Sequence, residues 1–181
     1  MAGKIELILG PMFSGKTSEL FRRIKKYKVA KKNCALIRYS RDNRYSSERI
    51  FNHDMESLDI LLFSRDCLQE NEPELMPFDV IGIDEGQFIN GISSFSDKFA
   101  NLGKIIIISA LDGDFKRKGF NTFLGDIIPL CEEVLKLNSI CHHCQSELGA
   151  FTQRTTDDQE VEKIGGLEMY KSTCRRCHEK K

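Results

Sequence analysis

Four short apolar runs along the chain have the length and the β-branched content of buried strands. They lie at residues 4–9, 34–37, 78–83 and 104–109. Two longer stretches carry apolar residues at helical spacing and predict helices from 18 to about 32 and over 92–102, the second closed by Gly103. A weaker pattern over 58–76 indicates one helix and one strand. Strands and helices are therefore expected up to about Ile140, where the character of the chain changes.

The loop between the first strand and the first helix is the most informative segment. It consists of Gly10, Pro11, Met12, Phe13, Ser14, Gly15, Lys16 and Thr17. A glycine-bounded loop that ends in Lys-Thr at a helix start is the pattern of a phosphate-binding loop, whose backbone N–H groups and helix N-terminus attract phosphate. We expect Lys16 to reach the β- and γ-phosphates of a nucleotide and the Thr17 hydroxyl to bind Mg²⁺.

Polar residues follow later strands at their carboxyl ends, where ligands gather in a nucleotide-binding sheet. Asp84 ends the third apolar run, and we expect it to hold Mg²⁺ through water. Glu85 comes next, and a carboxylate beside a γ-phosphate can take a proton from an attacking hydroxyl. Asp42 and Arg44 follow the second run, either at the ligand or in an ordinary solvent loop. Phe115 follows the fourth run and either stacks on a base or packs in the core.

Composition excludes several classes of protein. The 181 residues contain 27 Lys and Arg and 27 Asp and Glu, so the net charge is zero and no nucleic-acid footprint is expected. The basic residues between 22 and 32 are therefore interpreted as a solvated helix face rather than a nucleic-acid stripe. No apolar run has the length of a membrane helix, and no signal peptide is recognised, so we expect a reducing compartment.

Two Cys-x-x-Cys pairs mark the C-terminal part. They comprise Cys141, Cys144, Cys174 and Cys177, and four thiolates of this kind predict a closed structural Zn²⁺ site rather than a redox pair. The separation of the pairs exceeds the roughly 15–20 residues of tandem knuckles, so the segment between them is expected to form a long loop. Within that segment Gly165 and Gly166 permit close backbone approach, and the loop could cover a ligand as a lid.

Taken together, these motifs resemble type II thymidine kinases in their short poxviral form. The resemblance covers nearly the whole chain and rests on residues 10–17, 42–45, 84–88, 110–115 and 164–166 together with both cysteine pairs. It implies an α/β fold with a RecA-like P-loop core and a parallel sheet over 1–139, and a small zinc-binding domain with a lasso loop over 140–181. It implies transfer of the γ-phosphate of ATP to the 5′-hydroxyl of thymidine with Mg²⁺.

The resemblance also implies residue roles. Glu85 would be the general base, and residues 10–17 would hold ATP and its metal together with Asp42, Asn43, Arg44, Asp84, Gly86 and Gln87. The thymine pocket would be lined by Met12, Phe88, Leu111, Phe115 and Thr152. The base edge would meet the backbone of Val161, Glu162, Lys163, Ile164 and Gly165, and Tyr170 would close the site.

Further expectations follow from the resemblance: a homotetramer, inhibition by dTTP, a cytoplasmic location, and neither nucleic acid nor membrane as a partner. The chain departs from the family at Asp114, where a threonine is usual, which places a charge near the pocket. The segment from Cys144 to Thr152 is one residue longer than is common. The alternative hypothesis is a nucleic-acid-binding P-loop ATPase with a zinc ribbon, which would need a basic, salt-sensitive surface.

Overall fold

A six-stranded parallel sheet forms the centre of the molecule, in the order β5-β2-β6-β7-β1-β8. The computed structural model describes residues 2–41, 50–51, 57–58, 60–68, 72–120, 122–156 and 165–180. The strands of the sheet are β1 (Lys4–Gly10), β2 (Cys34–Tyr39), β5 (Leu61–Arg65), β6 (Val80–Ile83), β7 (Ile105–Leu111) and β8 (Glu133–Lys136). Two short strands, β3 (Ile50–Phe51) and β4 (Ser57–Leu58), pair outside the sheet.

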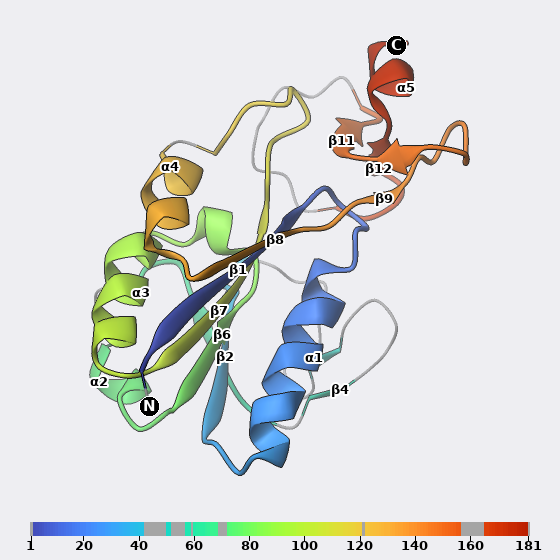
Figure 1. Cartoon of the computed structure of the whole chain (residues 1–181). Coiled ribbons are helices and arrows are strands. Elements are labelled where there is room, and N and C mark those ends of the chain that lie inside the picture. Colours follow the sequence, from blue (N-terminus) through green and yellow to red (C-terminus); the bar gives the residue numbers. More distant parts are fainter. Residues whose placement is uncertain are drawn as a thin grey trace.

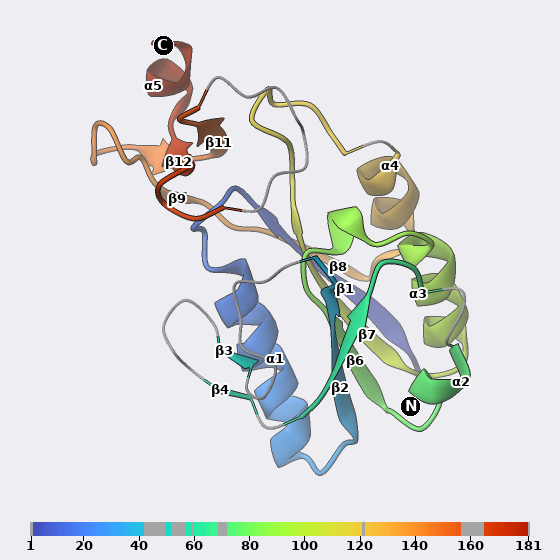
Figure 2. The same cartoon turned by 180° about the vertical axis from the view of Figure 1, so that it is seen from behind.

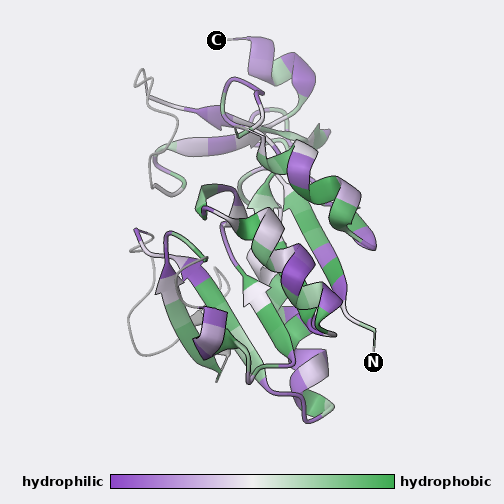
Figure 3. Ribbon diagram, turned by 90° about the vertical axis from the view of Figure 1, so that its left-hand side faces the viewer, coloured by the Kyte–Doolittle hydropathy of each residue, from purple (hydrophilic) through white to green (hydrophobic). Residues whose placement is uncertain are grey.

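Helices cover both faces of this sheet. Figure 1 shows α1 (Lys16–Val29) on one face and α2 (Glu72–Leu75), α3 (Ile92–Asn101) and α4 (Phe123–Ile127) on the other. Two 3₁₀ turns, Gly86–Phe88 and Ile128–Leu130, follow β6 and α4. Leu20, Phe21 and Ile24 of α1 pack on one side of the sheet, and stacked Phe95 and Phe99 of α3 pack on the other. This double cover explains the continuous apolar strands, which Figure 3 draws mostly in green.

The first helix is shorter than the sequence predicts, because it ends at Val29 instead of near Lys32. Lys31 takes a left-handed conformation with φ of 58°. Its N–H bonds the Lys28 carbonyl, and the N–H of Lys32 bonds the Tyr27 carbonyl. This pair of bonds is the Schellman motif, which satisfies the last carbonyls of a helix and turns the chain away.

The described residues of the C-terminal segment, 139–156 and 165–180, lie beyond the end of β1, as Figures 1 and 2 show. It contains β9 (Ser139–Ile140), β10 (Leu148–Gly149), β11 (Phe151–Arg154), β12 (Tyr170–Thr173) and α5 (Arg175–Glu179). β9 pairs with β10 and β11 pairs with β12, both antiparallel. The prediction of a long loop between the cysteine pairs is therefore partly wrong, because β10, β11 and β12 lie in the described part of that segment. Among the described residues, no helix has the length and apolar character needed to cross a membrane.

Candidate active site

The phosphate-binding loop is shaped by two glycines. A Cβ on Gly10 would lie 2.7 Å from the Leu137 carbonyl oxygen and 2.6 Å from Ser14 Oγ, so no larger residue fits there. Gly15 has φ of 83°, which favours glycine, and directly precedes α1. The Ser14 hydroxyl and the Lys16 ammonium each donate to the Pro11 carbonyl at 2.8 Å. The Lys16 ammonium therefore lies against the loop that is expected to bind the nucleotide phosphates.

Asp84 connects this loop to the sheet. It is buried at the end of β6, and its two carboxylate oxygens lie 3.3 and 3.2 Å from the Thr17 hydroxyl. The Ser109 hydroxyl on neighbouring β7 also donates to it, as does the N–H of Glu85 at 3.1 Å. A hydroxyl and a carboxylate side by side are the hard oxygen donors that Mg²⁺ prefers. Thr17 and Asp84 together could therefore hold that metal.

Glu85 is fixed by a neighbour. It adopts a left-handed backbone conformation with φ of 53°, and its Oε2 accepts a 2.8 Å bond from the Gln87 amide nitrogen. The Gln87 amide oxygen accepts the N–H of Leu111 at 3.0 Å. Gln87 therefore links the carboxylate to β7. Between them, Gly86 leaves no room for a side chain, because its Cβ would lie 2.7 Å from Ile108.

The expected thymine-pocket residues come from distant parts of the chain, and three contacts bring them together in two pairs. The N–H of Met12 donates to the Thr152 hydroxyl at 3.0 Å, which joins the phosphate-binding loop to β11. The Arg154 guanidinium lies 4.1 Å from the centre of the Phe115 ring and donates to the Tyr170 hydroxyl at 2.7 Å. The structure thus brings Met12 to Thr152, and Phe115 to Tyr170 through Arg154.

Phe88 lies in an aromatic cluster that is continuous with the hydrophobic core. Its ring centre is 5.3 Å from that of Tyr39 and 5.4 Å from that of Phe120. Leu111 ends β7 next to Gln87, as described above. Both residues therefore border the region that follows the carboxyl ends of β6 and β7.

Asp114 is buried, and its carboxylate is engaged within its own loop. It accepts the N–H groups of Lys116 and Lys118, each at 2.8 Å, and its own N–H donates to the Lys118 carbonyl. The charge that the sequence places near the pocket therefore ties the 114–118 turn together. A short acidic side chain in such a turn is a common solution, because it can hydrogen-bond the backbone two residues on.

Several expected site residues lie outside the described part of the chain: Asp42, Asn43, Arg44, Val161, Glu162, Lys163 and Ile164. Gly165 is described, and a Cβ there would lie 2.4 Å from the Met169 sulfur. The close approach that this glycine permits is therefore to Met169 of the same chain. Gly166 donates its N–H to the Glu168 carboxylate at 2.7 Å.

The four predicted metal ligands converge. The sulfur atoms of Cys141, Cys144, Cys174 and Cys177 all lie within 4.8 Å of one another, and those of Cys144 and Cys174 are 3.9 Å apart. Tetrahedral zinc with bonds of about 2.3 Å separates its sulfurs by about 3.8 Å, so the cluster fits Zn²⁺. Hydrogen bonds from Ser146 lower the pKa of the Cys144 thiol to about 6.

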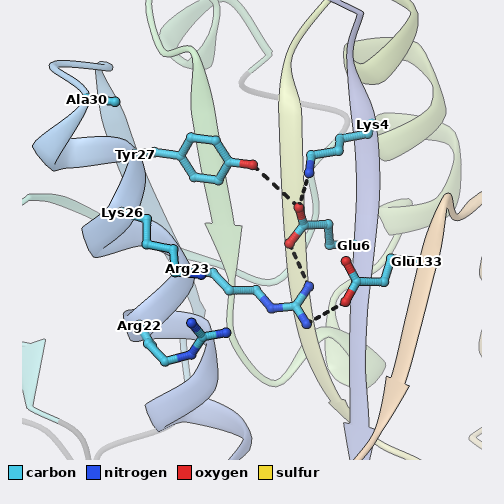
Figure 4. A pocket seen from close by; sticks show the side chains of 8 residues that line it. All are labelled: Lys4, Glu6, Arg22, Arg23, Lys26, Tyr27, Ala30 and Glu133. Carbon is cyan, nitrogen blue, oxygen red and sulfur yellow. Dashed lines mark hydrogen bonds and ion pairs between the residues drawn. The ribbon is translucent and has the colours of Figure 1, made fainter.

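A separate polar cleft of about 490 Å³ lies between α1 and the edge of the sheet, lined by Lys4, Glu6, Arg22, Arg23, Lys26, Tyr27, Ala30 and Glu133. Figure 4 shows Arg23 between Glu6 of β1 and Glu133 of β8. Arg22 pairs with Glu19 at 2.5 Å. These ion pairs partly neutralise the basic face of α1 and argue against the alternative hypothesis of a nucleic-acid-binding ATPase.

Sequence reasoning did not single out Arg154, Ser109 or Arg23. Arg154 stands two residues after Thr152, so strand alternation would have placed both on one side of β11. Ser109 is the one polar residue of β7, and a buried hydroxyl there needs a hydrogen-bond partner. Arg23 is one of many basic residues between 22 and 32, and nothing in the sequence distinguishes it from them. Its partners Glu6 and Glu133 come close to it only in the folded chain.

Comparison with known proteins agrees with this geometry. A family model described as "Thymidine kinase" matches residues 3–178. The thymidine kinase of sheeppox virus (strain KS-1) is 48% identical over 176 residues, which cover 97% of each chain. That of vaccinia virus (strain Western Reserve) is 46% identical over the same coverage. Among solved structures, the flagellar accessory protein FlaH from Methanocaldococcus jannaschii superposes with a TM-score of 0.56 at 14% identity, covering 87% of this chain and 74% of FlaH. This last similarity concerns the fold alone.

Proposed function

Because the chain belongs to the thymidine kinase family and so phosphorylates thymidine, we propose that it takes the phosphate from ATP and uses Glu85 as the general base. The observation that carries this proposal is the link from Glu85 through Gln87 to β7, beside the Thr17–Asp84 pair. A carboxylate held next to a metal and phosphate position is placed to accept a proton from the attacking alcohol.

The donor half of the site is the loop over residues 10–17. Its backbone N–H groups and Lys16 bind the phosphates of ATP, and the N-terminus of α1 adds partial positive charge. Asp42, Asn43, Arg44, Asp84, Gly86 and Gln87 complete this half in the proposal. Mg²⁺, when bound, neutralises phosphate charge, and Thr17 and Asp84 are the residues that hold it.

The acceptor half lies between the core and the C-terminal segment. Met12, Phe88, Leu111, Phe115 and Thr152 hold the thymine ring, while residues 161–165 and Tyr170 close over it. The Met12–Thr152 hydrogen bond supports this arrangement, because it joins the phosphate-binding loop to β11 across 140 positions of sequence. The donor half and the acceptor half of the site therefore meet at this hydrogen bond.

The transfer itself needs few protein groups. The thymidine 5′-oxygen forms a bond to the γ-phosphorus, the bond from that phosphorus to the bridging oxygen of ADP breaks, and the hydroxyl proton passes to Glu85. Gln87 orients the receiving carboxylate, since its amide is anchored at both ends. Lys16 and Arg44 stabilise the charge that spreads over the phosphate oxygens.

Zinc has a structural role in this proposal. The four thiolates fix both ends of the segment that carries β11 and β12. A loop whose ends are already fixed loses less entropy when it closes on a ligand. A homotetramer, inhibition by dTTP and a cytoplasmic location remain part of the proposal on the strength of the family resemblance, and light scattering and a dTTP titration test the first two.

The test is a panel of nucleosides with Mg·ATP, analysed for 5′-monophosphates, on the wild type and on Glu85→Gln. We expect dTMP to dominate, and the variant to lose about 10²-fold or more in kcat with its KM for ATP little changed. Asp126→Asn, which changes an exposed carboxylate on α4, is the matched control and should keep full activity. A wild type that makes no dTMP refutes the function, whereas an unimpaired Glu85→Gln removes only the general base.

A further inference from the structure

Arg154 is a buried arginine that the proposed mechanism does not use. Only 3% of its surface is exposed, and a buried arginine needs partners for its guanidinium. It is the last residue of β11, at the side of the C-terminal segment that meets the core. Burial of a charged side chain is costly, so its contacts indicate what the position is for.

Arg154 contacts two aromatic residues from separate parts of the chain. Its guanidinium lies 4.1 Å from the centre of the Phe115 ring, which belongs to the loop after β7. It also lies 5.2 Å from the centre of the Tyr170 ring and donates to the Tyr170 hydroxyl at 2.7 Å. One planar cation therefore joins an aromatic residue of the core to one of the C-terminal segment.

Strand geometry places Arg154 on the same side as Thr152. The two residues are two apart on β11, so their side chains leave the strand in the same direction. Thr152 meets Met12 of the phosphate-binding loop there, and Arg154 meets Phe115. Arg154 is also directly opposite Tyr170 in the β11–β12 register.

We propose that Arg154 is a positioning residue for nucleoside binding, which holds the Phe115 ring and the Tyr170 hydroxyl in the arrangement that receives the base and sugar. This inference rests on the proposed placement of Phe115 and Tyr170 at the nucleoside. Arg154 acts through these two residues, and it has no part in phosphate transfer. Its loss therefore weakens nucleoside binding and leaves ATP binding unchanged.

Two interactions set the size of the expected effect. A desolvated cation over an aromatic ring and a hydrogen bond from a charged donor are each among the stronger non-covalent contacts. We expect Arg154→Met to raise the KM and the Kd for thymidine by about tenfold to a hundredfold. The KM for ATP should stay within about twofold. Arg154→Lys should recover little of this loss, because a lysine ammonium offers neither the planar stack nor the fork of donors.

Arg117→Met is the matched control. Arg117 also joins the core to the C-terminal segment through an arginine–aromatic contact, because its guanidinium lies 5.6 Å from the centre of the Phe151 ring. It also pairs with Glu179 at 3.5 Å. Those partners are not in the proposed nucleoside site. We therefore expect Arg117→Met to keep the wild-type KM for thymidine even where it lowers the melting temperature as much as Arg154→Met.

The experiment measures KM for thymidine and for ATP, kcat, and the Kd for thymidine by calorimetry, on the zinc-loaded full chain. If Arg154→Met does not fold, Tyr170→Phe decides, since it removes only the hydroxyl and should raise the thymidine KM severalfold. An active wild type whose Arg154→Met or Tyr170→Phe variant keeps a normal thymidine KM overturns this inference alone. A proportional rise in the KM for both substrates also overturns it, because that result indicates a general structural role. Absence of dTMP formation by the wild type instead overturns the proposed function.

Discussion

Arg23 is the clearest place to test how the core is held together, because one guanidinium satisfies three carboxylates. It donates to Glu6 at 2.6 Å, to Glu19 at 2.8 Å and to Glu133 at 2.7 Å. Glu6 is 4% exposed and Arg23 is 7% exposed, so their ion pair is buried, whereas Glu133 leaves 52% of its side chain exposed (Figure 4). Burial alone would raise the pKa of Glu6, but hydrogen bonds from Lys4 and Arg23 outweigh it and lower the pKa. We predict that Arg23→Met strongly destabilises the fold.

The magnitude follows from what the substitution leaves behind. Removing one partner of a buried ion pair costs roughly 3–5 kcal/mol, because the other charge stays buried without full compensation. Glu6 keeps its ion pair with Lys4, so we expect a loss near the lower limit, about 3 kcal/mol. In a chain of this length that corresponds to a fall in melting temperature of roughly 6–12 °C. Glu6→Gln combined with Arg23→Met should recover much of the loss, because neither charge then remains.

Unfolding is followed by circular dichroism in urea and by calorimetry, with zinc present throughout. Arg22→Met is the matched control, since Arg22 is the preceding residue, pairs with the same Glu19, and leaves 53% of its side chain exposed. An exposed ion pair contributes less to stability than a buried one, so this control should lower the melting temperature much less than Arg23→Met does. Equal losses for Arg22→Met and Arg23→Met would refute the reasoning, as would a double variant no more stable than Arg23→Met.

Two further predictions concern acid and metal. A hydrogen bond from Arg22, together with one from Arg23, lowers the pKa of Glu19 from 4.5 to about 2, so its contribution to stability is complete above pH 4.5 and is lost as the pH falls towards 2. The free energy of unfolding of Glu19→Gln should therefore be lower than that of the wild type above pH 4.5, and the difference should shrink as the pH falls towards 2. A difference that stays constant with pH in urea unfolding would contradict this prediction. Cys174→Ser should bind well under one equivalent of zinc and lose thymidine phosphorylation, because β11 and β12 lose their anchor. Metal analysis showing full zinc in this variant would exclude Cys174 as a ligand.

The sequence predicts the parts of this molecule that depend on local physics. The segment 10–17 needs glycine where the backbone turns and Lys-Thr where a helix begins, and each requirement is visible within a few residues. The buried strands are also recognisable locally, because a strand covered on both faces needs a short continuous run of apolar residues. The cysteine pairs were predictable because metal ligation leaves a spacing signature, and their sulfurs do converge. The end of α1 was missed because a lysine in the left-handed conformation closes it, where a glycine is the usual signal.

What the sequence could not show are partnerships between segments that only the fold brings together. Arg23 and Glu133 are 110 positions apart, and the topology makes them neighbours by placing β8 beside β1. The sequence around Arg154 has no feature that marks this residue, and its contacts with Phe115 and Tyr170 become visible only in the fold. Each of these arginines is buried where two separate parts of the chain meet, and each satisfies several partners at once. A guanidinium suits this task because it stays ionised and presents five donors in a rigid plane. Buried arginines that bridge distant segments are therefore the residues to examine first when the local motifs of such a chain have already been explained.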